Sequence, residues 1–130
     1  MKLSEAIIIG MTKTKQTFGT YFYNTDKGLE ACALGAACVG AEMSWGEDPR
    51  EYINKNFPVA GIRVSQCPAP GCKSEIGFFN HVGFMVVHLN DHHQWDRGRI
   101  ALWVKEIEAR VEGPAPTISP CKEKQLTAVA

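Results

Sequence analysis

Two cysteines and a later group of histidines constrain this chain more than any other feature. Cys67 and Cys72 flank a Pro-Ala-Pro-Gly loop, and the histidines that follow are His88, His92 and His93. Proline restricts the backbone of such a loop and glycine permits a sharp turn, so two thiols can be directed to one point. Thiolates and imidazoles are the usual ligands of Zn²⁺. The pattern therefore predicts a loop that a metal ion ties to a helix.

Residues 67–93 resemble a two-cysteine, two-histidine zinc finger in the order of their ligands. Such fingers place two to four residues between the cysteines, about twelve before the first histidine, and three to five between the histidines. The corresponding gaps here are four, fifteen, and three or four residues. The middle gap is thus three residues longer, which is nearly one helical turn. The resemblance implies a finger-like zinc knuckle with four protein ligands and a structural role.

A wider resemblance links this chain to a set of small uncharacterised bacterial and phage proteins. Three phrases carry it: MKLSEAI at residues 1–7, CALGAA at residues 32–37, and HLNDxHxW at residues 88–95. The resemblance implies no function. It does place the second histidine of the last phrase at His93.

His92 and His93, which are adjacent, are therefore both candidates for the fourth ligand. Ideal helical geometry pairs His88 with His92, one turn further on. The Asn-Asp pair at residues 90–91 predicts that the helix ends first, which favours His93. We predict four zinc ligands: Cys67, Cys72, His88 and His93. His81, two turns before His88 in the expected helix, is an alternative to His88.

Composition places the chain among ordinary globular domains. Its 130 residues are 45% hydrophobic and 22% charged, with a formal net charge of zero. This balance gives no electrostatic footprint for nucleic acid. An odd number of cysteines, five in all, argues against a disulfide framework. The apolar run at residues 6–9 is too short for a signal sequence or a membrane span, so we expect a cytoplasmic protein without membrane contact.

The hydrophobic pattern predicts a mainly α fold of four to five helices, with a short β-hairpin near residues 17–30. Ser4 is the expected cap of the first helix, and Asp48 with Pro49 forms the sharpest helix start in the chain. The expected helices cover residues 5–14, 29–43, 49–57, 76–89 and 100–111. We expect one domain at residues 1–113, including the finger-like segment 67–93, and a flexible tail at residues 114–130.

These features favour a non-enzymatic, zinc-stabilised helical module that acts through a protein partner or weak nucleic-acid contacts. A metal-free helical interaction domain with free thiols at Cys67 and Cys72 is the first alternative. The second is an enzyme, which needs an open metal position or a nucleophilic Cys32 beside a histidine. Cys32 and Cys38 are six residues apart in the expected second helix and project from different faces, so they do not form a ligand pair.

Overall fold

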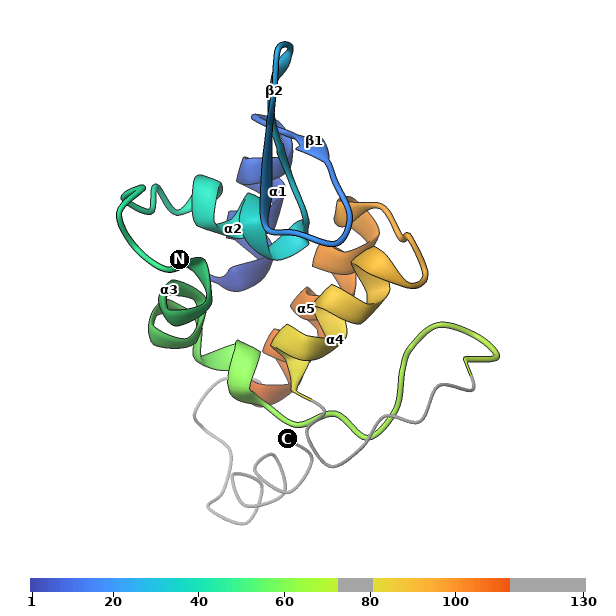
Figure 1. Cartoon of the computed structure of the whole chain (residues 1–130). Coiled ribbons are helices and arrows are strands. Elements are labelled where there is room, and N and C mark those ends of the chain that lie inside the picture. Colours follow the sequence, from blue (N-terminus) through green and yellow to red (C-terminus); the bar gives the residue numbers. More distant parts are fainter. Residues whose placement is uncertain (73–80, 113–130) are drawn as a thin grey trace.

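The computed structural model describes residues 1–72 and 81–112, which form five α-helices, a short 3₁₀ helix and a small sheet (Figure 1). In chain order these elements are α1 (Leu3–Met11), β1 (Lys15–Gln16), β2 (Phe22–Thr25), β3 (Gly28–Ala31), α2 (Ala33–Gly40), α3 (Pro49–Asn56), η1 (Pro58–Gly61), α4 (Val82–Asp91) and α5 (Arg97–Glu112). The helix number fits the prediction. The three-stranded sheet makes the mainly α assignment only partly correct.

Helices α1 and α2 pack unusually close together because both present small residues at their contact. A methyl group on Gly10 would overlap the carbonyl oxygen of Ala36, and one on Gly40 would overlap that of Ala6. Larger apolar side chains complete a single core that also involves α4 and α5. Fully buried examples are Leu3, Ile7, Met85, Leu89, Ile100 and Val104.

The predicted hairpin is present, and a third strand accompanies it. β2 and β3 are antiparallel, and Thr25 and Gly28 are the last paired residues before the turn. β1 pairs with the other edge of β3 in parallel, so the order is β1-β3-β2. The helix predicted from residue 29 is therefore wrong at its start, because residues 29–31 belong to β3. α2 begins only at Ala33, after Cys32 as its N-cap.

Ser4 does not cap the first helix, contrary to the sequence prediction. α1 begins at Leu3, ends at Met11, and has Lys2 at its N-cap. Ser4 lies inside the first turn, where its hydroxyl and its backbone N–H both donate to the carboxylate of Glu108 on α5, at 2.5 and 3.1 Å. A carboxylate from another helix thus satisfies an amide that a local cap would otherwise serve.

Two helices agree closely with their predicted signals. The Asp48 carboxylate accepts from the N–H of Arg50, Pro49 opens α3, and the helix ends at Asn56. α5 spans the apolar stripe expected at residues 100–111. The helix expected at residues 76–89 begins at Val82 in the described part of the chain, while residues 76–80 and the expected tail lie outside it. None of the described helices is long and apolar enough to cross a membrane.

Candidate metal centre

The segment that connects η1 to the two cysteines is hydrogen-bonded to the start of α4. The N–H of Val82 donates to the carbonyl of Ile62 at 2.8 Å, and Arg63 forms an isolated antiparallel bridge with His81. These contacts place residues 62–63 beside the start of α4. Ala69 is only 6% exposed and anchors the loop to the core.

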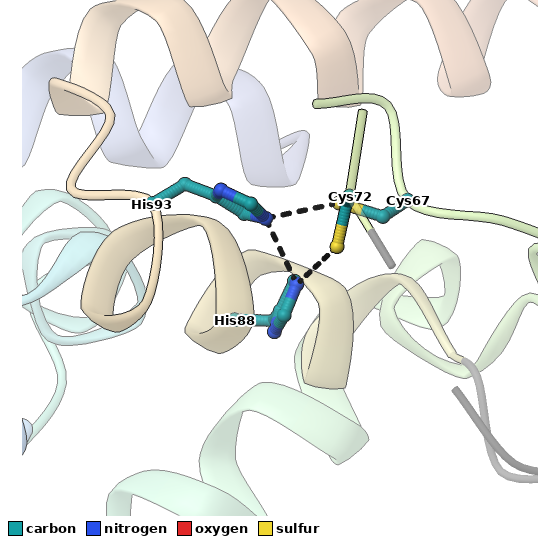
Figure 2. A group of neighbouring side chains, drawn as sticks. All are labelled: Cys67, Cys72, His88 and His93. Carbon is teal, nitrogen blue, oxygen red and sulfur yellow. Dashed lines mark hydrogen bonds between the residues drawn. The ribbon is translucent and has the colours of Figure 1, made fainter. Parts of the chain in front are cut away.

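The loop at residues 67–72, called the knuckle below, turns as its sequence predicts. Gly71 adopts a φ of 73°, a left-handed conformation that glycine tolerates without strain. The N–H of Cys72 donates to the carbonyl of Ala69 at 3.2 Å, and the N–H of Ala69 donates to the sulfur of Cys67 at 3.4 Å. An N–H that points at sulfur favours the thiolate form needed for metal binding. Both cysteine side chains approach His88 and His93 (Figure 2).

The end of α4 supplies the histidines through a sharp reversal of the chain. His88 lies in the last turn, and its carbonyl accepts from the N–H groups of His92 and His93 at 2.9 and 3.3 Å. Gln94 has a φ of 53°, and the N–H of Trp95 returns to the carbonyl of Leu89 at 3.0 Å. The reversal carries the side chain of His93 back toward His88.

Four potential ligand atoms converge between the knuckle and α4 (Figure 2). The sulfur of Cys67 lies 3.5 Å from Nε2 of His93, and the sulfur of Cys72 lies 3.5 Å from Nε2 of His88. The two Nε2 atoms are 3.1 Å apart, and all four ligand atoms lie within 4.8 Å of one another. All four residues are partly buried.

Three of these separations match the distances between ligand atoms around a tetrahedrally coordinated ion. Bonds of about 2.3 Å to sulfur and about 2.0 to 2.1 Å to nitrogen put the ligand atoms of a regular tetrahedron about 3.6 Å apart for sulfur and nitrogen, and about 3.3 Å apart for two nitrogens. The two sulfur–nitrogen distances and the nitrogen–nitrogen distance given above agree with these values within about 0.2 Å. The geometry therefore fits one metal ion held by two cysteines and two histidines.

The ring orientations explain why His93 belongs to this group and His92 does not. The His92 ring stacks on that of His88, with centroids 5.0 Å apart and an interplanar angle of 15°. Stacked rings direct their nitrogens side by side and not toward a common point. The His93 ring stands at 84° to that of His88, which turns its Nε2 toward the same centre.

His81 is not placed as the sequence reading assumed. Its backbone is extended, with φ −103° and ψ 157°, and it forms the N-cap of α4. It is therefore outside the helix that carries His88, and it lies outside the group of four. The three histidines that do approach one another all follow residue 87.

Burial and mutual proximity prepare the imidazoles for metal binding. Burial lowers the pKa of His88, and the positive forms of His93 and His92 lower it further. The pKa of His93 falls for the same reasons, burial first and then His92. Both rings are thus kept neutral with a free lone pair near pH 7. Burial raises the pKa of the Cys67 thiol, and the neighbouring Cys72 adds to this, so a metal must displace protons from the thiols.

Asn90 fixes the end of α4, a role that its sequence context did not reveal. Its side chain is fully buried, and its carbonyl oxygen accepts from the Gln16 side chain at 2.9 Å and the Ala33 N–H at 3.2 Å. Its amide donates to the carbonyl of Thr17 at 3.0 Å and to Asp91 at 2.8 Å. The sequence pattern predicts only a helix stop at residues 90–91, whereas α4 includes both residues. A polar side chain within an apolar helix face was the available signal.

Arg97 provides a second buried polar anchor beside the same turn. Its guanidinium donates to the hydroxyl and carbonyl of Thr14 at 2.7 and 2.8 Å and to the carbonyl of Ala31 at 3.2 Å. Burial lowers its pKa. These bonds tie the start of α5 to the segments around β1 and β3. The chain reversal at residues 92–95, called the histidine turn, therefore lies between two helix ends that hydrogen bonds hold in place.

The remaining described cysteines do not approach the group of four. Cys32 is buried at the N-cap of α2, where its sulfur accepts from the N–H of Gly35 at 3.3 Å. Burial raises the pKa of the Cys32 thiol, and burial raises that of Cys38 to about 12. A nucleophilic cysteine needs the opposite shift. Cys121 lies outside the described residues.

Comparisons of the chain with protein-family models, with curated proteins and with solved structures find no match. The resemblances in the sequence thus stay predictions, and the functional argument rests on the four converging side chains.

Proposed function

We propose that this protein is a non-enzymatic module whose fold is stabilised by one structural zinc ion. The supporting observation is the convergence of four potential ligand atoms, which all lie within 4.8 Å of one another. The ligands are Cys67, Cys72, His88 and His93. The ion joins the knuckle to the end of α4, two parts of the chain that are otherwise held together by few buried side chains.

Zinc is the metal that this donor set suits best. Two thiolates with two imidazoles in a tetrahedral arrangement are typical of structural zinc sites, whereas calcium, magnesium and manganese prefer oxygen ligands. Four protein ligands also fill the tetrahedral coordination, which leaves no position for a reacting water. This supports a structural role over a catalytic one.

Exposed aromatic side chains favour a protein partner. Phe18, Tyr23 and Trp45 are 45%, 59% and 64% exposed, and the ring of Trp45 packs edge-on against Phe22 of β2 at 4.9 Å. Aromatic residues are enriched in protein interfaces. The zero net charge supplies little attraction for a nucleic acid, so contacts of that kind would be weak.

Metal analysis of protein purified without added zinc tests the proposal. We expect one zinc ion per chain. Cys67→Ser and His93→Ala should each lose the metal and lower the melting temperature, because each removes one of four ligands. Absence of metal from the purified wild type, together with unchanged melting of both variants, would contradict the proposed function and favour the metal-free alternative.

His92→Ala is the matched control for His93→Ala. The two histidines are adjacent, but only His93 directs its Nε2 into the cluster. We expect His92→Ala to retain one zinc ion per chain. If His92→Ala loses zinc and His93→Ala keeps it, the assignment of the fourth ligand is wrong.

A further inference from the structure

We infer that Cys67 and Cys72 form a reversible thiol switch, in which a peroxide converts the pair to a disulfide and releases the metal. The inference rests on the proposed zinc site. It adds a chemical modification of that site and a way to regulate it.

Accessibility separates this pair from the other described cysteines. Cys32 and Cys38 are 6% and 0% exposed, whereas Cys67 and Cys72 are partly exposed. The chain at residues 65–72 also lines a solvent-facing depression of about 450 Å³, which is ample space for a small peroxide. An oxidant can therefore reach the knuckle without opening the core.

The position of the two sulfurs favours a bond between them. They lie within 4.8 Å of each other on one short loop. A disulfide requires about 2.05 Å, so the sulfurs must approach by less than about 3 Å. Gln66, Pro70 and Gly71 are exposed, and Ala69 is the one buried residue of the knuckle. The loop can therefore adjust without displacing core side chains.

The reaction balances with peroxide as the oxidant. The bound ion holds both sulfurs as thiolates whatever the pKa of the free thiols. One thiolate attacks the peroxide, breaks its O–O bond and becomes a sulfenic acid while hydroxide leaves. The second thiolate attacks the sulfenic sulfur, forms the S–S bond and expels a second hydroxide. Two protons from solvent convert both hydroxides to water. The cysteine pair loses two electrons and the peroxide gains them, and the ion departs because two of its four ligands no longer carry charge.

The release is expected to be local. The disulfide keeps the knuckle closed, while His88 and His93 stay on the end of α4, which Asn90 holds through its own hydrogen bonds. What is lost is the connection between the knuckle and α4. A thiol reductant with added zinc reverses the step, since the disulfide is short-range and exposed.

The test treats the full zinc-loaded chain with hydrogen peroxide and follows zinc with a chromogenic chelator. We expect one zinc ion released per chain, a fall in free thiols from five to three, and a peptide map that joins Cys67 to Cys72. Dithiothreitol with zinc should restore both values. Cys121→Ser is the control variant, and it should release the same amount of zinc.

Three outcomes overturn the switch. Zinc can stay bound at full peroxide reaction, the pair can be oxidised to sulfinic acids that dithiothreitol does not restore, or the disulfide can include Cys121 or a second chain. A chain that holds no zinc before peroxide is added contradicts the proposed function and removes the basis of the switch. A chain that holds zinc and keeps it contradicts the switch alone.

Discussion

The contact between α1 and α2 and the contact between the knuckle and α4 are held together by opposite means. At the first, small residues let two helices approach until a single added methyl group would meet backbone. At the second, the knuckle itself contributes only one buried side chain, that of Ala69. Apolar burial is the main stabilising term in folding, and it scales with the area removed from water. The first contact has that term in full and the second nearly lacks it.

A metal ion is most useful in a small domain where little apolar surface can be buried. A turn-rich loop with one buried alanine cannot offset the entropy of ordering its backbone by burial. Four ligands bound to one ion supply the missing stabilisation and also fix the position of the loop relative to α4. We therefore expect the helical core to fold and persist without metal, and the knuckle to depend on it.

Gly10→Ala should lower the free energy of unfolding the most. Its new methyl group would overlap the carbonyl oxygen of Ala36 and push α1 away from α2. Overpacking against backbone costs about 3 kcal/mol. Denaturant unfolding measures the loss. Gly46→Ala is the control, since nothing lies near its added Cβ. Equal stability of the two variants would show that α1 and α2 are not in close contact.

Asn90→Leu should come next, with a loss of about 2 kcal/mol. The substitution leaves the N–H of Ala33 and the Gln16 side chain without their acceptor in a buried environment. Asn54→Leu, on the exposed side of α3, serves as the control and should change the unfolding free energy little. If both variants unfold alike, Asn90 does not anchor the histidine turn to the core.

Alkaline pH should weaken the core by a smaller amount. Burial raises the pKa of the Cys38 thiol from 9.0 to about 12, so the unfolded chain loses this proton first. The stabilisation is complete below pH 9 and is lost as pH rises toward 12. Between pH 9 and 10 the loss is about 1 kcal/mol. Urea unfolding across this range measures it, and Cys38→Ala should show a shallower decline. An identical slope in both proteins would disprove the contribution of Cys38.

Metal removal should have the smallest effect on α1 and α2. After chelation we expect amide hydrogen exchange to accelerate at the knuckle and at residues 92–95, because both segments lose the metal ion that connects them. Amides of α1 and α2 should accelerate much less, by the amount that the lower melting temperature requires. Uniform acceleration throughout the chain would mean that the metal supports the whole fold, and the comparison between the two contacts would then fail.

Local chemistry explains why parts of this fold were predictable. The Asp-Pro start of α3, the apolar stripe of α5 and the turn of the hairpin each depend on residues adjacent in sequence. The grouping of the two cysteines with His88 was also expected from their spacing, whereas His93 was preferred to His92 because of the HLNDxHxW phrase and the helix stop expected at residues 90–91. Residues 29–31 were misread as helix because their pairing partners, in β1 and β2, lie elsewhere in the chain.

The order of the amino acids sets which side chains are available to a metal and on which kinds of loop and helix end they lie. Tertiary structure decided how they are used. The chain reverses at Gln94 and Trp95, and His93, not His92, directs its Nε2 toward that of His88. The carboxylate of Glu108, not the hydroxyl of Ser4, accepts from an amide at the start of α1. A turn or a helix cap depends on residues close in sequence. The orientation of an imidazole ring and the burial of a carboxylate depend instead on packing between distant segments.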